Sequence, residues 1–204
     1  MKIIKRGAEA VLYQDGNTVV KERIKKSYRI DQIDDKLRKE RTRKEVKLLN
    51  EARRTGILTP KVLDTDEKNN KIIMEFIDGQ RLKDILNSVP DNKKVLLAEE
   101  IGENVGKLHE AGIIHGDLTT SNIMIKNNQM YFIDFGLGEF SKRTEDFAID
   151  LSVLKEAFKS THFKYLELLW KSFIRVYSQT FSNHEKVLKA LEEIEKRGRY
   201  IKRD

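Results

Sequence analysis

The chain of 204 residues carries a formal net charge of +7, from 40 lysine and arginine residues against 33 aspartate and glutamate residues, and contains no cysteine. The absence of cysteine excludes a disulfide framework and a thiolate metal site, and no apolar run is long enough to span a bilayer or to form a signal peptide. We therefore expect a cytoplasmic protein without membrane contact. Its positive charge favours anionic partners such as nucleotides or RNA. The alternative explanation of the charge is a lysine- and glutamate-rich solvated surface, as in heat-adapted proteins.

Short strands separated by turns are expected in the first part of the chain. Residues 10–13 are an apolar run, and residues 15–17 (Asp-Gly-Asn) form a turn because Gly and Asn tolerate positive φ. Residues 18–20 then resume with β-branched side chains, so the pattern predicts a hairpin. Residues 31–55 contain no Pro or Gly and many strong helix formers, which predicts one long helix.

A change of composition at Asp78 and Gly79 divides the chain. Before it, residues 61–63 and 72–77 are predicted strands around a polar turn. After it the pattern is mainly helical, with one further hairpin at residues 123–133. The predicted helices of this second part cover residues 82–86, 91–112, 146–160, 162–180 and 183–197.

The sequence HGDLTTSN at residues 115–122 is followed by Asp-Phe-Gly at residues 134–136. Protein kinases place an Asp, an Asn and a second Asp in this order and spacing. Asp117 is the predicted catalytic residue, which accepts or orients the proton of the attacking hydroxyl. Asn122 and Asp134 are the predicted ligands of Mg²⁺, which they would hold against the phosphates of ATP. The alternative is a turn rich in Asp, Ser and Asn, which are common turn formers.

Lys21, in a predicted strand, is the candidate ATP-binding lysine. Glu45 lies on the face of the long helix that is expected to turn inward, where a carboxylate needs a partner because an unpaired buried charge is costly. Lys21 would supply that partner. The alternatives are an ordinary strand lysine, with Arg23 among several competing cations, and an i, i+4 surface pair between Glu45 and Arg41.

Three further positions complete the expected nucleotide site. Gly7 lies between the first two strands, where a phosphate-covering loop needs glycine so that the backbone can approach closely. A plain turn is the alternative there. The backbone groups of Glu75 and Ile77, at a strand end, are the candidate hinge that reads the adenine base.

Two acidic residues compete for the role of bracing residues 115–122, the candidate catalytic loop. Asp150 lies among apolar residues on a predicted helix, where a carboxylate is unexpected unless it accepts backbone hydrogen bonds. Asp146 is the rival candidate. His115 is expected to be a packed, hydrogen-bonded scaffold residue rather than a carrier of protons.

These features predict an α+β fold of the minimal bilobal protein-kinase type. A strand-rich N-lobe with one long helix would comprise residues 1–77. A reduced helical C-lobe with a basic C-terminal tail would comprise residues 78–204.

Over nearly its whole length the chain resembles the small atypical kinases of the KEOPS complex, the assembly that makes threonylcarbamoyladenosine on tRNA. The reduced glycine turn, residues 20–23, 41–45 and 74–79, both motifs above and the basic end at residues 196–199 carry this resemblance. It implies a relation to RIO kinases, ATP and Mg²⁺ as cofactors, and a non-specific serine/threonine protein kinase with ATPase activity. It also implies binding to the metal-containing tRNA-modifying subunit, to a small regulatory subunit and to tRNA through basic patches.

The chain departs from ordinary protein kinases at three points. Gly116 replaces the Arg that pairs with a phosphorylated activation loop, and Thr119 replaces a phosphate-contacting Lys. No Ala-Pro-Glu follows the Asp-Phe-Gly segment. We therefore expect no activation by loop phosphorylation and inefficient phosphorylation of peptides. A small-molecule phosphotransferase of the aminoglycoside-kinase type and a nucleotide-binding pseudokinase scaffold are the competing functions.

The C-terminal end combines cations with an aromatic side chain. Ser182 and Glu185 predict a capping box for the last helix, and Gly198 predicts its end. Beyond Gly198 we expect a mobile or partner-ordered tail that contacts tRNA, with cations on phosphates and the aromatic ring on a base. A solubilising end whose cations complement the helix dipole is the alternative. The residues concerned are Lys196, Arg197, Arg199, Tyr200, Lys202 and Arg203.

Overall fold

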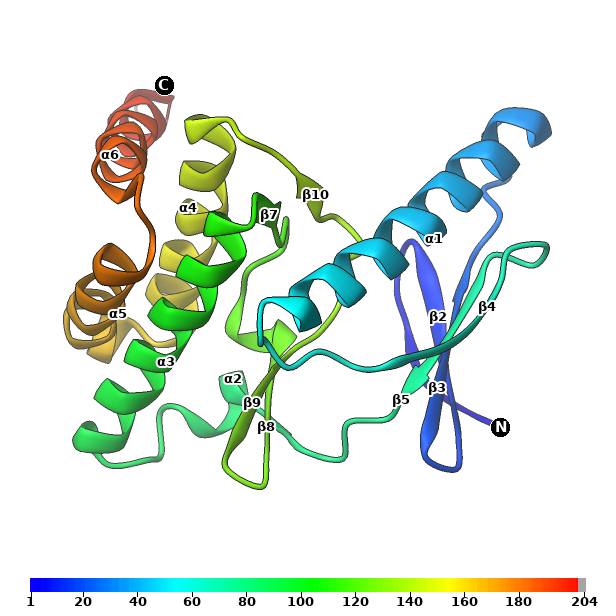
Figure 1. Cartoon of the computed structure of the whole chain (residues 1–204), viewed down its shortest axis with the longest axis horizontal. Helices are drawn as coiled ribbons and strands as arrows, with labels where there is room; N and C mark the ends of the chain where they lie inside the picture. Colours follow the sequence, from blue (N-terminus) through cyan, green and yellow to red (C-terminus); the bar gives the residue numbers. More distant parts are fainter. Residues whose placement is uncertain (202–204) are drawn as a thin grey trace.

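The computed structural model describes residues 1–201, in which a strand-rich N-terminal part and a helical C-terminal part are joined by the connection after β5 (Figure 1). The N-terminal part is an antiparallel sheet in the order β1-β2-β3-β5-β4, with the long helix α1 running beside it. Its elements are β1 (Lys2–Arg6), β2 (Ala10–Asp15), β3 (Thr18–Arg23), α1 (Asp31–Arg54), β4 (Val62–Asp66) and β5 (Lys71–Glu75).

Local sequence explains how β3 and α1 come to face each other. The β2–β3 hairpin turns at Gly16, whose φ of 58° is in the left-handed region, and Asp15 pairs with Thr18 across the turn. Apolar and small side chains recur at helical spacing along the C-terminal half of α1, and this face is buried. Glu45 lies on the same face, so the fold carries a carboxylate into the interior beside β3.

Helices dominate the second part of the chain (Figure 1). They are α2 (Leu82–Ile85), α3 (Asp91–Glu110), α4 (Thr144–Thr161), α5 (Leu166–Thr180) and α6 (His184–Ile201), with short 3₁₀ turns η1 (Thr120–Asn122) and η2 (Phe163–Tyr165). The strands are β6 (Gln80–Arg81), β7 (Ile113–Ile114), β8 (Ile123–Lys126), β9 (Gln129–Phe132) and β10 (Glu139–Phe140). The predicted β8–β9 hairpin gains β6 as a third strand. Strand β7, just before the catalytic loop in the chain, pairs with β10, which follows the Asp-Phe-Gly segment.

The main hydrophobic core lies between the helices of the second part and extends to α1 through Leu48, Leu49 and Ala52. Helix α3 packs closely on α5, because Gly102 faces the backbone of Phe173: a Cβ at Gly102 would lie 2.5 Å from the Phe173 carbonyl oxygen. None of the helices in the described part of the chain combines the length and apolarity that crossing a bilayer requires.

Two expectations for the C-terminal end were wrong. Helix α6 does not stop at Gly198 but continues to Ile201. The predicted capping box is also absent from the contacts of the described residues, because the Ser182 hydroxyl and backbone N–H both donate to the carboxylate of Glu110. Lys202 and Arg203 of the expected tail lie outside the described residues, so the proposed contact with tRNA stays a prediction.

Candidate nucleotide and phosphoryl-transfer site

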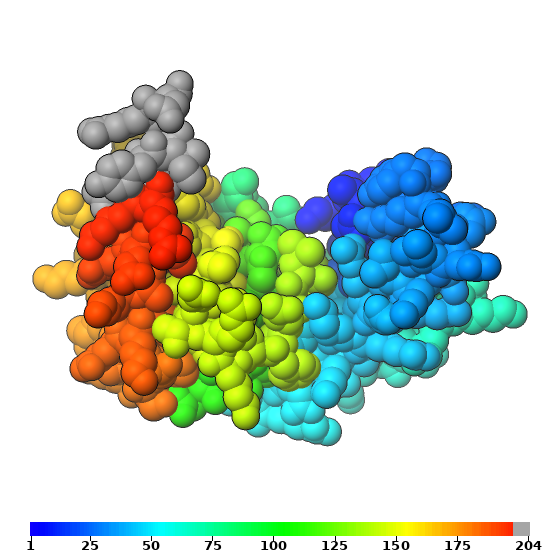
Figure 2. All heavy atoms as spheres, turned by 90° about the horizontal axis from the view of Figure 1, so that it is seen from above, coloured from blue at the N-terminus to red at the C-terminus, as the bar shows by residue number. Residues whose placement is uncertain are grey.

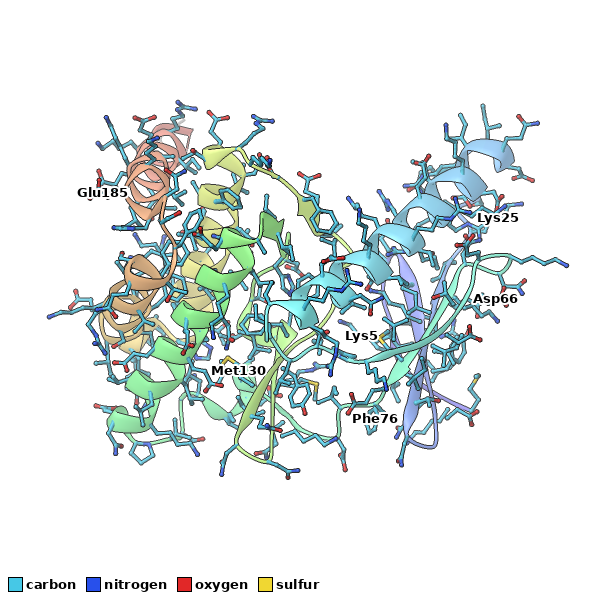
Figure 3. The ribbon with its side chains drawn as sticks, viewed as in Figure 1. Lys5, Lys25, Asp66, Phe76, Met130 and Glu185 are labelled. Atoms are coloured by element: carbon cyan, nitrogen blue, oxygen red, sulfur yellow. The ribbon has the colours of Figure 1, made fainter. Side chains whose placement is uncertain are left out.

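A cleft lies between the sheet and the helical part, and the space-filling view shows the molecule hollowed there (Figure 2). Its apolar end is lined by Leu12, Val19 and Met74 and by the residues that follow β5, among them Phe76, which Figure 3 places on the connection between the two parts. Its polar end is lined by the turn after β1, by Lys5 and Lys21, and by Asp117 and Asp134. An apolar slot that leads to a cluster of cations and carboxylates suits a flat base joined to a phosphate chain.

Lys21 is the centre of a buried charge cluster in this cleft. Its Nζ lies 2.6 Å from Glu45 Oε1 and 2.6 Å from Asp134 Oδ1. Burial alone would lower the pKa of Lys21, but the charges of Glu45 and Asp134 outweigh it, so the pKa is raised and the ammonium stays charged. The predicted pair between Lys21 and Glu45 is therefore present. The alternative partner, Arg41, turns away and pairs with Glu9 at 2.7 Å.

Arg23 is a second buried cation on Glu45, which sequence reasoning treated only as a competitor of Lys21. Its Nη2 lies 2.5 Å from Glu45 Oε2, so the carboxylate is shared by two cations. Residues 21 and 23 point to the same face of β3 because side chains alternate along a strand. Because two cations stand two positions apart in a predicted strand, the sequence already indicated that Lys21 and Arg23 could share one carboxylate.

Asp134 has an unusual backbone that aims its carboxylate into the cleft. Its φ is 64°, in the left-handed region that non-glycine residues seldom adopt. Such strain persists where the surrounding structure enforces it, often at functional sites. Burial favours the neutral carboxyl group, but Lys21 attracts the charged form more strongly, so the pKa of Asp134 is lowered. The carboxylate is therefore ionised and available to a cation at neutral pH.

The catalytic loop holds Asp117 and Asn122 together. Asn122 Nδ2 donates to the backbone carbonyl of Asp117 at 2.9 Å and to Asp117 Oδ2 at 2.8 Å. These bonds orient the Asp117 carboxylate and leave the Asn122 amide oxygen as the free end of that side chain. Asp117 lines the same hollow as Lys21 and Asp134.

The carboxylate of Asp150 braces this loop from α4. Its oxygens accept the backbone N–H of His115 and of Gly116, each at 2.9 Å. Burial raises the pKa of Asp150, but hydrogen bonding and charge interaction with His109 outweigh it, so the pKa is lowered. The rival candidate was wrong for this role, because Asp146 instead accepts a hydrogen bond from the Ser141 hydroxyl at 2.6 Å.

His115 is a buried scaffold residue, as expected. Its Nε2 donates to the Ile133 carbonyl at 3.1 Å, its Nδ1 accepts the Asp117 N–H at 3.3 Å, and its ring lies 4.5 Å from that of Phe135. Burial lowers the pKa of His115, which keeps the ring neutral in this double role. The ring therefore ties the catalytic loop to the Asp-Phe-Gly segment.

Gly116 has a structural reason to be glycine. Its φ is 78°, and a Cβ at this position would lie 2.2 Å from the Leu137 carbonyl oxygen. The segment after Asp-Phe-Gly therefore passes directly over the catalytic loop, where β10 pairs with β7. An arginine at this position has no room, which accounts physically for the loss of the phosphate-pairing residue of ordinary kinases.

The glycine turn is held closed by a backbone hydrogen bond and by two cations, Lys26 and Arg41. The Gly7 N–H donates to the Ala10 carbonyl at 2.9 Å, and Lys26 donates to the Ala8 carbonyl. Glu9 pairs with Arg41 of α1. Gly7 lines the polar end of the cleft, so it is placed where a backbone approach to phosphate is needed.

The expected hinge is partly occupied by sheet hydrogen bonds. The Glu75 N–H donates to the Lys61 carbonyl at 2.9 Å, so it is not available to a base. Both Glu75 and Ile77 line the apolar end of the cleft. The Glu75 carbonyl and the Ile77 N–H are the backbone groups left for an adenine edge.

The donor atoms fit Mg²⁺ rather than a transition metal. Asn122 and Asp134 present amide and carboxylate oxygens, which are the hard ligands that Mg²⁺ prefers. Within residues 1–201 no cluster of three or more His, Cys, Asp or Glu could hold a metal by itself. A magnesium ion at this place would depend on phosphate oxygens to complete its coordination, as is usual for nucleotide sites.

Known families and structures resemble the chain over most of its length. The RIO domain family matches residues 1–167. KEOPS complex subunit Bud32 of Pyrococcus abyssi is 44% identical over 215 aligned residues, which span 100% of this chain and 98% of that protein. The probable bifunctional tRNA threonylcarbamoyladenosine biosynthesis protein of Methanosarcina mazei is 45% identical over 98% of this chain, but the chain spans only 36% of that longer protein.

Two solved structures share the fold. The Rio2 kinase–ADP/Mg²⁺–phosphoaspartate complex from Chaetomium thermophilum aligns with a TM-score of 0.63 and 18% identity over 98% of this chain and 72% of that one. WaaP in complex with acyl carrier protein aligns with a TM-score of 0.62 and 15% identity over 96% of this chain and 88% of that one. At these identities the likeness concerns the fold alone, and it confirms the predicted α+β kinase-like fold.

Proposed function

Since the chain belongs to the RIO domain family, in the group of KEOPS complex subunit Bud32, we propose that it is an ATP-dependent atypical serine/threonine kinase and ATPase. It would act in the cytoplasm as a subunit of a complex that forms threonylcarbamoyladenosine on tRNA. The gathering of Lys21, Asp117, Asn122 and Asp134 on one cleft is the observation that carries this proposal.

Each of these side chains has a distinct task in phosphoryl transfer. Lys21, kept charged by Glu45, binds phosphate oxygens, and Asp117 orients the attacking hydroxyl or water. Asn122 and Asp134 would hold Mg²⁺, which neutralises negative charge on the phosphates when bound. Positioning and charge neutralisation account for most of the catalysis of this reaction class.

The short segment after Gly136 favours water over a peptide as the usual phosphate acceptor. Its strand β10 is paired with β7, and α4 begins at Thr144. No long loop remains there to support an extended peptide. ATP hydrolysis is therefore the main activity that we propose, with phosphorylation of protein hydroxyls as a slow reaction.

The proposed partners are the metal-containing tRNA-modifying subunit, a small regulatory subunit and tRNA. The net charge of +7 supports a polyanion as one partner. Lys196 and Arg197 are exposed near the end of α6 and contribute to a basic C-terminal end. Binding to tRNA through such cations should weaken steeply with salt, because it releases counterions.

The deciding experiment measures ATP hydrolysis by the purified chain, alone and with its complex partners, in the wild type and in Asp117→Ala and Asp134→Ala variants. We expect each substitution to reduce turnover by at least about 10²-fold, since removal of one preorganised charge-stabilising group has effects of this size. Asp64→Ala is the matched control, because Asp64 is an exposed carboxylate on β4, away from the cleft.

Three outcomes separate the candidate functions. Undiminished hydrolysis in both variants would contradict an active site at this cleft. Absence of turnover in the wild type under every condition would favour a nucleotide-binding pseudokinase scaffold. Rapid phosphate transfer to an aminoglycoside, without stimulation by the complex partners, would favour a small-molecule phosphotransferase.

A further inference from the structure

His162 is a buried histidine that links three separate segments of the C-terminal part. It follows the last residue of α4 and is 1% exposed. Its Nε2 lies 3.0 Å from Thr120 Oγ1, in the catalytic loop, and its Nδ1 lies 2.7 Å from Asn87 Oδ1, after α2. Nothing in the roles described above for the cleft accounts for this side chain.

The direction of each hydrogen bond in this chain follows from its neighbours. Asn87 Nδ2 donates to the Thr161 carbonyl at 3.1 Å, which leaves Asn87 Oδ1 as an acceptor facing His162. Nδ1 of His162 must therefore carry the proton and donate it to Asn87. In the neutral ring the other nitrogen, Nε2, is then an acceptor, so the Thr120 hydroxyl donates to it.

A neutral ring is required for this arrangement, because a protonated Nε2 cannot accept from a hydroxyl. Burial, with a smaller contribution from the positive charge of Lys83, lowers the pKa of His162 to about 4. The ring therefore stays neutral at neutral pH, and both nitrogen atoms keep the roles that the geometry assigns to them.

The hydroxyl held by His162 belongs to the turn that carries a candidate magnesium ligand. Thr120 is the first residue of η1 and Asn122 is its last. The turn is closed by a hydrogen bond from the Asn122 N–H to the Thr119 carbonyl at 3.0 Å. From this turn the Asn122 side chain reaches Asp117. A shift of Thr120 would therefore move Asn122 and, through it, the Asp117 carboxylate.

We propose that His162 is a positioning residue: through the Thr120 hydroxyl it holds η1 in the geometry that places Asn122 for metal and phosphate binding. The proposal rests on the proposed function for its effect on turnover, but its structural part concerns only the chain itself. Asn87 acts as the anchor that selects the tautomer of the ring. His162 touches no reacting atom.

The test removes the Thr120 hydroxyl without changing the shape of the side chain. Thr120→Val should raise the Mg²⁺ concentration for half-maximal ATP turnover by about five- to tenfold, the effect expected for loss of one buried hydrogen bond. Thr120→Ser keeps the hydroxyl and should restore the wild-type value. Ser160→Ala is the matched control, because this nearby hydroxyl is exposed and bonds only within α4.

A second pair of measurements does not depend on activity. The backbone N–H of Asn122, which closes the turn, should exchange with deuterium several times faster in Thr120→Val than in the wild type or Thr120→Ser, because the turn loosens. Nitrogen NMR of the histidine rings should assign the proton of His162 to Nδ1. The double variant Thr120→Val with His162→Gln should loosen η1 no more than the more damaging single variant, since both remove the same bond.

The outcomes distinguish this proposal from the proposed function. A wild-type chain without ATP turnover would end the proposed function, while amide exchange and the tautomer would still decide the role of His162. An Nε2–H tautomer would overturn the positioning role. Unchanged exchange at Asn122 in Thr120→Val would overturn it as well, whatever the turnover.

Discussion

The two walls of the cleft hold their polar groups by different physical means. On the N-terminal wall, Lys21 and Arg23 share the buried carboxylate of Glu45, and Asp134 supplies a second carboxylate to Lys21, so full charges balance one another. On the C-terminal wall, the backbone N–H groups of the catalytic loop and the ring of His109 bond to the buried carboxylate of Asp150, and the neutral ring of His115 ties the loop to the Asp-Phe-Gly segment. The first wall depends on charge and the second on hydrogen-bond direction.

This difference teaches where each wall is vulnerable. Loss of one member of a buried ion pair leaves an uncompensated charge in the interior, which costs several kcal/mol. Loss of one neutral hydrogen bond costs about 1 kcal/mol, unless a buried donor is left without an acceptor. Substitutions that preserve shape but change charge or donor direction should therefore separate the two walls.

The largest effect is expected for Glu45→Gln on the charged wall. The amide cannot neutralise Lys21 and Arg23, so the free energy of unfolding should fall by about 3–5 kcal/mol. Chemical denaturation measures this change. Glu40→Gln on the same helix is the control. Glu40 is exposed and forms a weak surface ion pair with Lys36 at 4.0 Å, so this variant should unfold as the wild type does. Equal losses in both variants would remove the contrast between buried and exposed charge.

A smaller effect is expected for Asp150→Asn on the C-terminal wall. The amide oxygen can accept from one backbone N–H, but the amide nitrogen would face the other, at His115 or Gly116. One unsatisfied buried donor should lower the free energy of unfolding by about 1–3 kcal/mol. In the matched variant Asp146→Asn, the Ser141 hydroxyl can rotate to accept from the new amide, so denaturation should reveal little change. A greater loss of unfolding free energy in Asp146→Asn than in Asp150→Asn would show that Asp146, and not Asp150, supports the catalytic loop.

The pH dependence of the free energy of unfolding should reveal the buried neutral ring of His162 on the C-terminal wall. The pKa of His162 is lowered from 6.5 to about 4 on folding, so the unfolded chain binds this proton first. The stability that depends on a neutral His162 is complete above about pH 6.5 and is lost as the pH falls through about 4. The wild type should therefore lose stability more steeply than His162→Gln in that interval. Parallel pH profiles of the two proteins would contradict a buried neutral ring.

The smallest effect is expected in the segment that leads from Gly136 to the start of α4. Ser141 and Thr144 are the hydroxyl groups there, and Ser141 already bonds to Asp146. Because Gly116 leaves no arginine to pair with a phosphate, the double variant Ser141→Ala, Thr144→Ala should change ATP turnover by no more than about twofold. A loss beyond tenfold in steady-state assays would point to a phosphorylation switch on the cleft.

Local sequence determined most of the element order and the candidate residues of the cleft. The apolar spacing of the helices, the turn residues of the hairpins and the Asp117–Asn122–Asp134 spacing are properties of neighbouring residues, so they can be read without the fold. The position of Glu45 on the inward face of α1 also follows from helical periodicity. It was enough to indicate a buried partner for Lys21.

Only the tertiary structure decided which partners meet across long stretches of chain. Arg23 joins Glu45, Asp150 rather than Asp146 reaches the catalytic loop, and His162 reaches Thr120, because helices and strands distant in sequence pack at particular angles. The same holds for Ser182, whose hydroxyl is taken by Glu110 of α3 instead of its own helix. From the sequence alone, several hydrogen-bond partners are equally plausible for one polar side chain. The packing of the surrounding core selects one of them.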